Sequence, residues 1–105
     1  MINLLKETLE DIESAKKSIE DIRYIGLSDG SYCCDWEDFE KIADFEYDNG
    51  WGGEEIKSNL IIVFKDLSRM IRQEYDGSEW WIHVPAENPR KENSQLMTQD
   101  DLLKT

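Results

Sequence analysis

The residues best suited to chemistry lie in the stretch 44–55, DFEYDNGWGGEE, where carboxylates alternate with aromatic residues and three glycines follow. Four of its acids have the spacing of the first, third, fifth and twelfth ligand positions in a calcium loop. They are Asp44, Glu46, Asp48 and Glu55. Two other positions do not fit, because Asn49 replaces the glycine required at the sixth and the bulky Trp51 takes the eighth. A calcium site is one interpretation of this stretch, and an acidic strand over 44–48 with a turn at 49–50 is the other.

Acid–base catalysis is a second chemistry that closely spaced carboxylates can support. The sequence supplies no nucleophile beside a base, since its only histidine, His83, falls in a predicted strand. The glycines of 50–53 lack the lysine that follows in a phosphate-binding loop. Cys33 and Cys34 are adjacent, which suits free thiols better than a disulfide or a zinc site. We therefore predict a protein that is not an enzyme and needs no cofactor.

The chain carries a net charge of −12, and the charge is concentrated in one region. Residues 24–58 contain ten acidic and two basic residues, a net charge of −8. Such a surface repels nucleic acid and anionic membranes and attracts basic protein surfaces. No apolar run approaches the roughly 18 residues that span a bilayer. The N-terminus is amphipathic and acidic, unlike a signal peptide, so we expect a cytoplasmic protein.

Binding of a basic protein is the function that this charge favours. Carboxylates on alternate residues of a strand lie about 7 Å apart, close to the phosphate spacing along one strand of a duplex. Tryptophans near the acids could act as anchors, since aromatic residues are enriched at the energetic centres of interfaces. The residues predicted to contact the partner are Asp44, Glu46, Asp48, Trp51, Glu54, Glu55 and Trp81.

A small-ligand site is the alternative. Trp51, Tyr47, Tyr75 and the tryptophans at 80 and 81 could line a pocket near glycine amides, suited to a nucleotide-like signal. The net negative charge of the chain argues against an anionic ligand.

Two helices are expected to position these residues. Apolar residues recur at steps of three and four over 2–22, which predicts one long amphipathic helix. That helix would pack on the domain's own core, and its near-heptad spacing leaves a homodimer through this segment as an alternative. Asp35 is a typical N-cap, with Asp38 three residues on, and predicts a short second helix that ends near Ala43.

An antiparallel sheet is expected in the second half of the chain. Residues 59–84 alternate in character, and Asp76-Gly77 is a strong hairpin signal, so they predict a three-stranded meander. A further strand over 44–48 is a possible addition, and 24–28 or 31–34 could form a short one. The predicted fold is α+β: a long and a short helix packed on a small antiparallel sheet. We expect one domain over 1–84 and a polar tail over 85–105, in which Thr98 caps a short helix.

The acidic stretch and the hairpin together resemble small acidic proteins of phages and prophages. The segments that carry this resemblance are DFEYD at 44–48, GGEEI at 52–56 and EYDGSEWW at 74–81. Such phage proteins often inhibit host defence systems, including CRISPR nucleases, and some occupy the surface where the nuclease binds DNA. The resemblance implies an inhibitor of the anti-CRISPR kind that acts in a host cytoplasm, and it assigns no functional residues.

Overall fold

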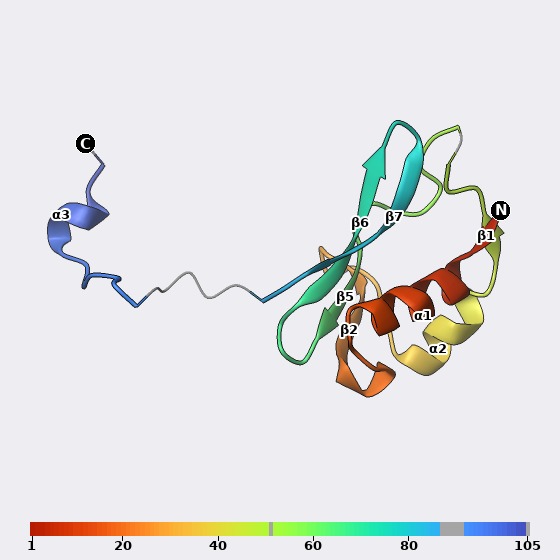
Figure 1. Ribbon diagram of the computed structural model, residues 1–105, viewed down its shortest axis with the longest axis horizontal. Coiled ribbons are helices and arrows are strands. Elements are labelled where there is room, and N and C mark those ends of the chain that lie inside the picture. Colours follow the sequence, from red (N-terminus) through yellow and green to blue (C-terminus); the bar gives the residue numbers. More distant parts are fainter. Residues whose placement is uncertain (51, 87–91, 105) are drawn as a thin grey trace.

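The computed structural model describes residues 1–50, 52–86 and 92–104, and shows a sheet with two helices against one face (Figure 1). Within these residues the main sheet has five antiparallel strands in the order β3-β2-β5-β6-β7. Their bounds are Ile22–Leu27 for β2, Cys33–Cys34 for β3, Leu60–Phe64 for β5, Arg69–Tyr75 for β6 and Ser78–Val84 for β7. The class is α+β, but the predicted arrangement with only a small meander is wrong, because β2 and β3 extend the sheet.

The N-terminal helix is much shorter than the predicted helix over 2–22. Helix α1 spans Leu4–Ser14, and Asn3 caps its start: the Asn3 side chain accepts a hydrogen bond from the Lys6 backbone N–H in the first turn. It ends before Lys16, which adopts a left-handed backbone conformation with a φ of 60°. The chain then forms a 3-10 turn, η1 (Ile19–Asp21), and enters β2. The single long helix that the homodimer alternative assumed is therefore not formed.

The remaining helices follow the predictions. Helix α2 spans Trp36–Ile42, and the Asp35 carboxylate accepts a hydrogen bond of 2.8 Å from the backbone N–H of Asp38, as the capping pattern predicted. Helix α3 spans Gln99–Leu102 with Thr98 as its N-cap, and in Figure 1 it lies away from the sheet. None of the helices in the described ranges is both long and apolar enough to cross a membrane.

The predicted meander within 59–84 forms strands β5, β6 and β7. At the β6–β7 turn, Asp76 and Gly77 both have positive φ values, 51° and 85°, as a tight hairpin turn of this type requires. The predicted strand over 44–48 is shorter and lies elsewhere. Only Glu46–Tyr47 forms β4, and it pairs with β1 (Ile2–Asn3) in a separate small sheet.

The hydrophobic core lies between the sheet and helices α1 and α2. Its residues come from all these elements and include the fully buried Ile62, Phe64 and Met70. On the opposite face of the sheet, Ile61, Ile71 and Ile82 lie in cross-strand register and are half-buried. The helices therefore cover one face of the sheet.

Gly26 is the one glycine at which a side chain would collide with backbone. A Cβ there would lie 2.3 Å from the carbonyl oxygen of Tyr32 and 2.8 Å from Cα of Cys33. We expect Gly26→Ala to lower the free energy of unfolding by about 1–3 kcal/mol, because β3 must move away from β2. Urea denaturation followed by circular dichroism measures this. Gly50→Ala is the matched control, since its Cβ would meet only the Ser78 hydroxyl at 4.0 Å; equal losses for both variants would contradict the prediction.

Candidate partner-binding site

The predicted acidic contact residues are at the surface. Asp44, Glu46, Glu54 and Glu55 are exposed, and Asp48 is half-buried. Two hydrogen bonds fix the ends of this stretch: the Asp44 carboxylate accepts from Asn3 Nδ2 at 2.9 Å, and the Glu55 carboxylate accepts from the Asp48 backbone N–H at 2.7 Å. The Asp44 and Glu55 carboxylates are therefore held in place, and both residues are still exposed to solvent.

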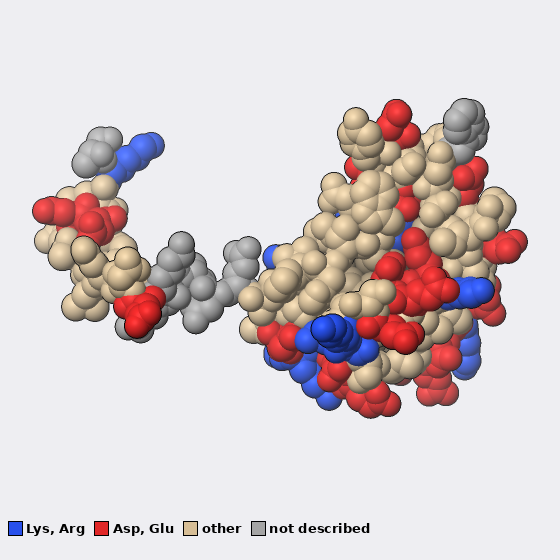
Figure 2. Space-filling view, viewed as in Figure 1, with Lys and Arg blue, Asp and Glu red and all other residues tan. Residues whose placement is uncertain are grey.

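Helix α2 adds further carboxylates beside this stretch. Glu37, Asp38 and Glu40 are exposed on α2, while Phe39 between them is buried. In Figure 2 acidic side chains gather over the part of the molecule where α1 and α2 lie, with some lysines and arginines among them, whereas uncharged side chains prevail over β6 and β7. On the face seen in Figure 2, acidic side chains are thus more frequent over the helices than over β6 and β7.

The structure buries Trp81, which the sequence analysis predicted to be a surface anchor, and exposes its neighbour Trp80. Trp81 is only 4% exposed, and its Nε1 donates a hydrogen bond of 3.0 Å to the hydroxyl of Thr8. It is a core residue and is not available as a surface anchor. Its neighbour Trp80 points the other way along β7 and is 36% exposed. Trp51, the other predicted anchor, lies outside the described residues.

The two alternative sites receive no support from the residues that the structure describes. Among the residues that the structure describes, no three histidine, cysteine, aspartate or glutamate side chains come together so that they could hold a metal ion, which leaves the calcium loop without support. The Asp44 and Glu55 carboxylates are instead hydrogen-bonded to the protein. Of the residues predicted to line a nucleotide pocket, Tyr47 is buried in the core and Tyr75 is 76% exposed.

A buried charge network, which the sequence did not reveal, connects the core to the acidic stretch. The Arg72 guanidinium is fully buried and lies 3.3 Å from Glu7 Oε1 and 3.2 Å from Glu79 Oε1. It also donates to the Tyr47 hydroxyl at 2.9 Å and lies over the Trp81 ring, 4.9 Å from its centroid. The Tyr47 hydroxyl in turn donates to Glu7 at 2.6 Å.

The titration properties of this network follow from its burial and hydrogen bonds. Burial raises the pKa of the Tyr47 hydroxyl, and its hydrogen bond to Glu7 raises it further. Burial lowers the pKa of Arg72, but its contacts with Tyr47, Glu7 and Glu79 outweigh this and raise the pKa overall. Arg72 is therefore charged at all ordinary pH values, and it compensates carboxylates from α1 and β7.

Glu79 contacts Arg72, and it also fixes the end of the acidic stretch. Its two carboxylate oxygens accept hydrogen bonds from the backbone N–H groups of Glu55 and Ile56, at 2.6 and 3.1 Å. Its own backbone N–H donates to the carbonyl oxygen of Asn49 at 2.7 Å. One residue of β7 thus holds the backbone at Asn49 and, further along the chain, at Glu55 and Ile56.

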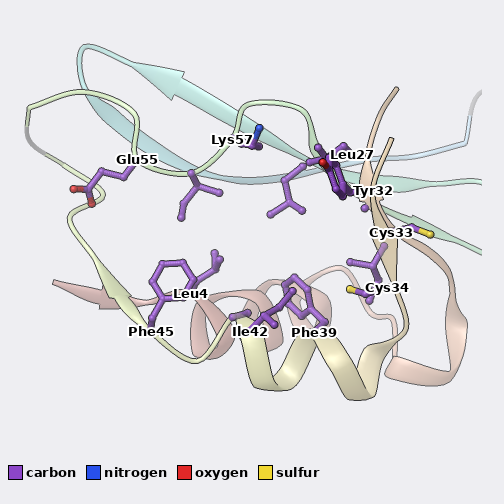
Figure 3. A pocket seen from close by; sticks show the side chains of 15 residues that line it. Leu4, Leu27, Tyr32, Cys33, Cys34, Phe39, Ile42, Phe45, Glu55 and Lys57 are labelled. Carbon is purple, nitrogen blue, oxygen red and sulfur yellow. The ribbon is translucent and has the colours of Figure 1, made fainter. Parts of the chain in front are cut away.

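An apolar cavity of about 700 Å³ opens between α2 and the sheet, beside the acidic stretch (Figure 3). Leu4 and Phe39 form its floor in this view, Cys33 and Cys34 of β3 lie at one end, and Glu55 lies at the other. Its volume is typical of sites that bind a small ligand or a partner's side chains. No pattern in the sequence predicted this cavity, although Ile42 and Phe45 on its border are apolar residues within the most acidic part of the chain.

Comparisons of the chain with protein-family models, with curated proteins and with solved structures found no match. Its function is therefore inferred from the residues and their arrangement.

Proposed function

We propose that this protein is a non-enzymatic inhibitor that binds a basic, nucleic-acid-binding protein through the acidic surface formed by residues 35–55. One observation carries this proposal: of the nine acidic residues in this segment, eight are exposed and Asp48 is half-buried. They are Asp35, Glu37, Asp38, Glu40, Asp44, Glu46, Asp48, Glu54 and Glu55. Lysine and arginine side chains that normally contact phosphates would pair with these carboxylates.

The acidic surface would imitate nucleic acid by its negative charge more than by a regular spacing of its carboxylates. Strand β4 is only two residues long, so Asp44, Glu46 and Asp48 do not form an extended ladder at phosphate intervals. Helix α2 supplies carboxylates on a second element, which widens the negative surface. Complementary charge of this kind mainly accelerates association and excludes anionic competitors.

The resemblance to small acidic phage proteins suggests the class of partner. A host defence protein with a basic nucleic-acid channel, such as a CRISPR nuclease, is the proposed target, and the host cytoplasm is the proposed place of action. Inhibition then needs no chemistry from this chain, because occupying the channel is sufficient to exclude DNA or RNA.

Capture from a bacterial lysate tests the proposal. The tagged wild-type protein should retain basic nucleic-acid-binding proteins at low salt, and added duplex DNA should compete with them. Asp44→Lys with Glu46→Lys should reduce capture by roughly tenfold or more, since each reversal replaces an attraction by a repulsion. Mass spectrometry of the retained proteins measures this.

The control has the same change in net charge on another part of the surface. Glu92 and Asp100 both follow β7 in the C-terminal segment, and both are exposed. Glu92→Lys with Asp100→Lys should leave capture within about twofold of wild type, because at ordinary salt exposed charges act over only about 10 Å. Equal capture by the wild type and both double variants would refute binding through the acidic surface.

A further inference from the structure

The cavity beside α2 is bordered by large apolar side chains that are exposed to solvent. Tyr32 is 74% exposed, Ile42 65% and Phe45 44%, and all three line the cavity. The interior adds further apolar side chains, from Leu4, Ile25, Leu27, Phe39, Ile56 and Leu60. Apolar surface that continues from a cavity onto its rim is typical of a site that a partner covers.

The surroundings of the cavity are negatively charged. Glu55 lines it, and Lys57 is the one basic residue among its lining residues. Asp35 and Asp38 lie close to the wall at Cys34: burial raises the pKa of this thiol, and these two carboxylates raise it further. Asp44 stands between two lining residues, Ala43 and Phe45. An anionic ligand is therefore disfavoured here, and cationic groups at the rim are favoured.

The walls of the cavity are fixed by backbone hydrogen bonds. The N–H of Leu4 donates to the carbonyl oxygen of Phe45 at 3.0 Å, which ties α1 to the segment after α2. On the other side, the Glu79 carboxylate holds the backbone of Glu55 and Ile56. A cavity held this way needs little reorganisation on binding, which favours affinity.

From these features we infer that the cavity receives the large apolar side chains of a basic segment of the partner protein, one in which leucine, methionine or phenylalanine lies between lysines and arginines. The apolar side chains enter between α2 and the sheet, and the cationic side chains pair with the acids around the rim. This inference rests on the proposed function and adds to it the feature that distinguishes the partner from other basic proteins.

A fluorescently labelled leucine–lysine peptide with leucines at helical spacing is the probe. Fluorescence anisotropy with the full-length protein should show binding, and a peptide with serine in place of leucine should bind at least tenfold more weakly. Ile42→Asn with Phe45→Asn should weaken binding of the leucine peptide by a similar factor without a change in charge. Leu67→Asn is the matched control: Leu67 is 59% exposed in the β5–β6 turn and does not line the cavity. Circular dichroism checks that each variant is folded.

The possible results separate this inference from the proposed function. If the Ile42 and Phe45 variant binds both peptides as the wild type does, while Asp44→Lys with Glu46→Lys weakens both, the inference is overturned and the acidic surface stands. Absence of any peptide binding overturns the inference, and lysate capture then decides the proposed function independently. Binding of the neutral dye Nile red that the peptide does not displace would assign the cavity to a small apolar ligand. A loss of self-association in the cavity variant would assign it to a second copy; either result overturns the inference.

Discussion

Arg72→Met is expected to lower the free energy of unfolding by about 3–5 kcal/mol, because it leaves the carboxylates of Glu7 and Glu79 buried without their cation. Both lie within 3.3 Å of the guanidinium, and the side chain of Glu79 is fully buried. A domain of this size is stable by only about 5–15 kcal/mol, so the variant should be marginal at best. Urea denaturation followed by tryptophan fluorescence gives the free energy.

Two comparisons test whether the loss is due to uncompensated charge. Arg69→Met changes an exposed arginine on the same strand and should cost less than about 0.5 kcal/mol. Adding Glu7→Gln and Glu79→Gln to Arg72→Met should recover part of the stability, since the buried negative charges are then removed. A triple variant as unstable as Arg72→Met, or an Arg72→Met protein as stable as Arg69→Met, would show that charge compensation is not the cause.

Trp81→Ala is the second substitution with a large expected effect, about 3–5 kcal/mol of unfolding free energy. The indole is in the core, packs under the Arg72 guanidinium and donates to the Thr8 hydroxyl. Its removal leaves a cavity, and the Thr8 hydroxyl loses one of its partners. Thermal unfolding monitored by circular dichroism should show a transition far below that of the wild type.

The neighbouring tryptophan provides the control. Trp80→Ala removes a side chain that is 36% exposed on the opposite face of the sheet, and it should cost only about 1 kcal/mol. Partner capture by this variant should equal that of the wild type. If Trp81→Ala were well folded but lost its partner, Trp81 would be a contact residue, as its position in the sequence had suggested, and its burial here would be contradicted.

The elements with strong local signals were predicted from the sequence. Asp76-Gly77 determines its hairpin because both residues accept positive φ values, and Asp35 determines the start of α2 because its carboxylate caps a backbone N–H. The end of α1 carried no such signal. Lys16 takes the left-handed conformation that glycine usually occupies, so the apolar periodicity seemed to continue to Ile22, which is in fact the first residue of β2. Tertiary pairing with β5 decided that segment.

The candidate site was predictable in its charge and not in its shape. The cluster of acidic residues at 44–55 predicted exposed carboxylates there, because charged side chains are rarely buried without a partner. The exceptions are Glu7, Arg72 and Glu79, whose burial depends on contacts between residues as far apart as 65 positions. The alternation of residues along β6 places Arg72 on the same face as the buried Met70, and this alternation was the one sequence signal that Arg72 is buried. The cavity depends on how α2 sits against the sheet, which no local pattern specifies.

The contacts of α1 also bear on the order in which the chain can fold during its synthesis. The hydroxyl of Thr8 and the indole of Trp81 are separated by 73 positions, and Glu7 and Arg72 by 65. At the usual rates of translation, roughly 4–15 s pass between the synthesis of Thr8 and that of Trp81. At the end of this interval α1 still lacks its contact with Trp81, whereas Phe45, whose carbonyl oxygen accepts a hydrogen bond from the Leu4 N–H, is already synthesised. Completion of β7 therefore supplies the last of these contacts of α1.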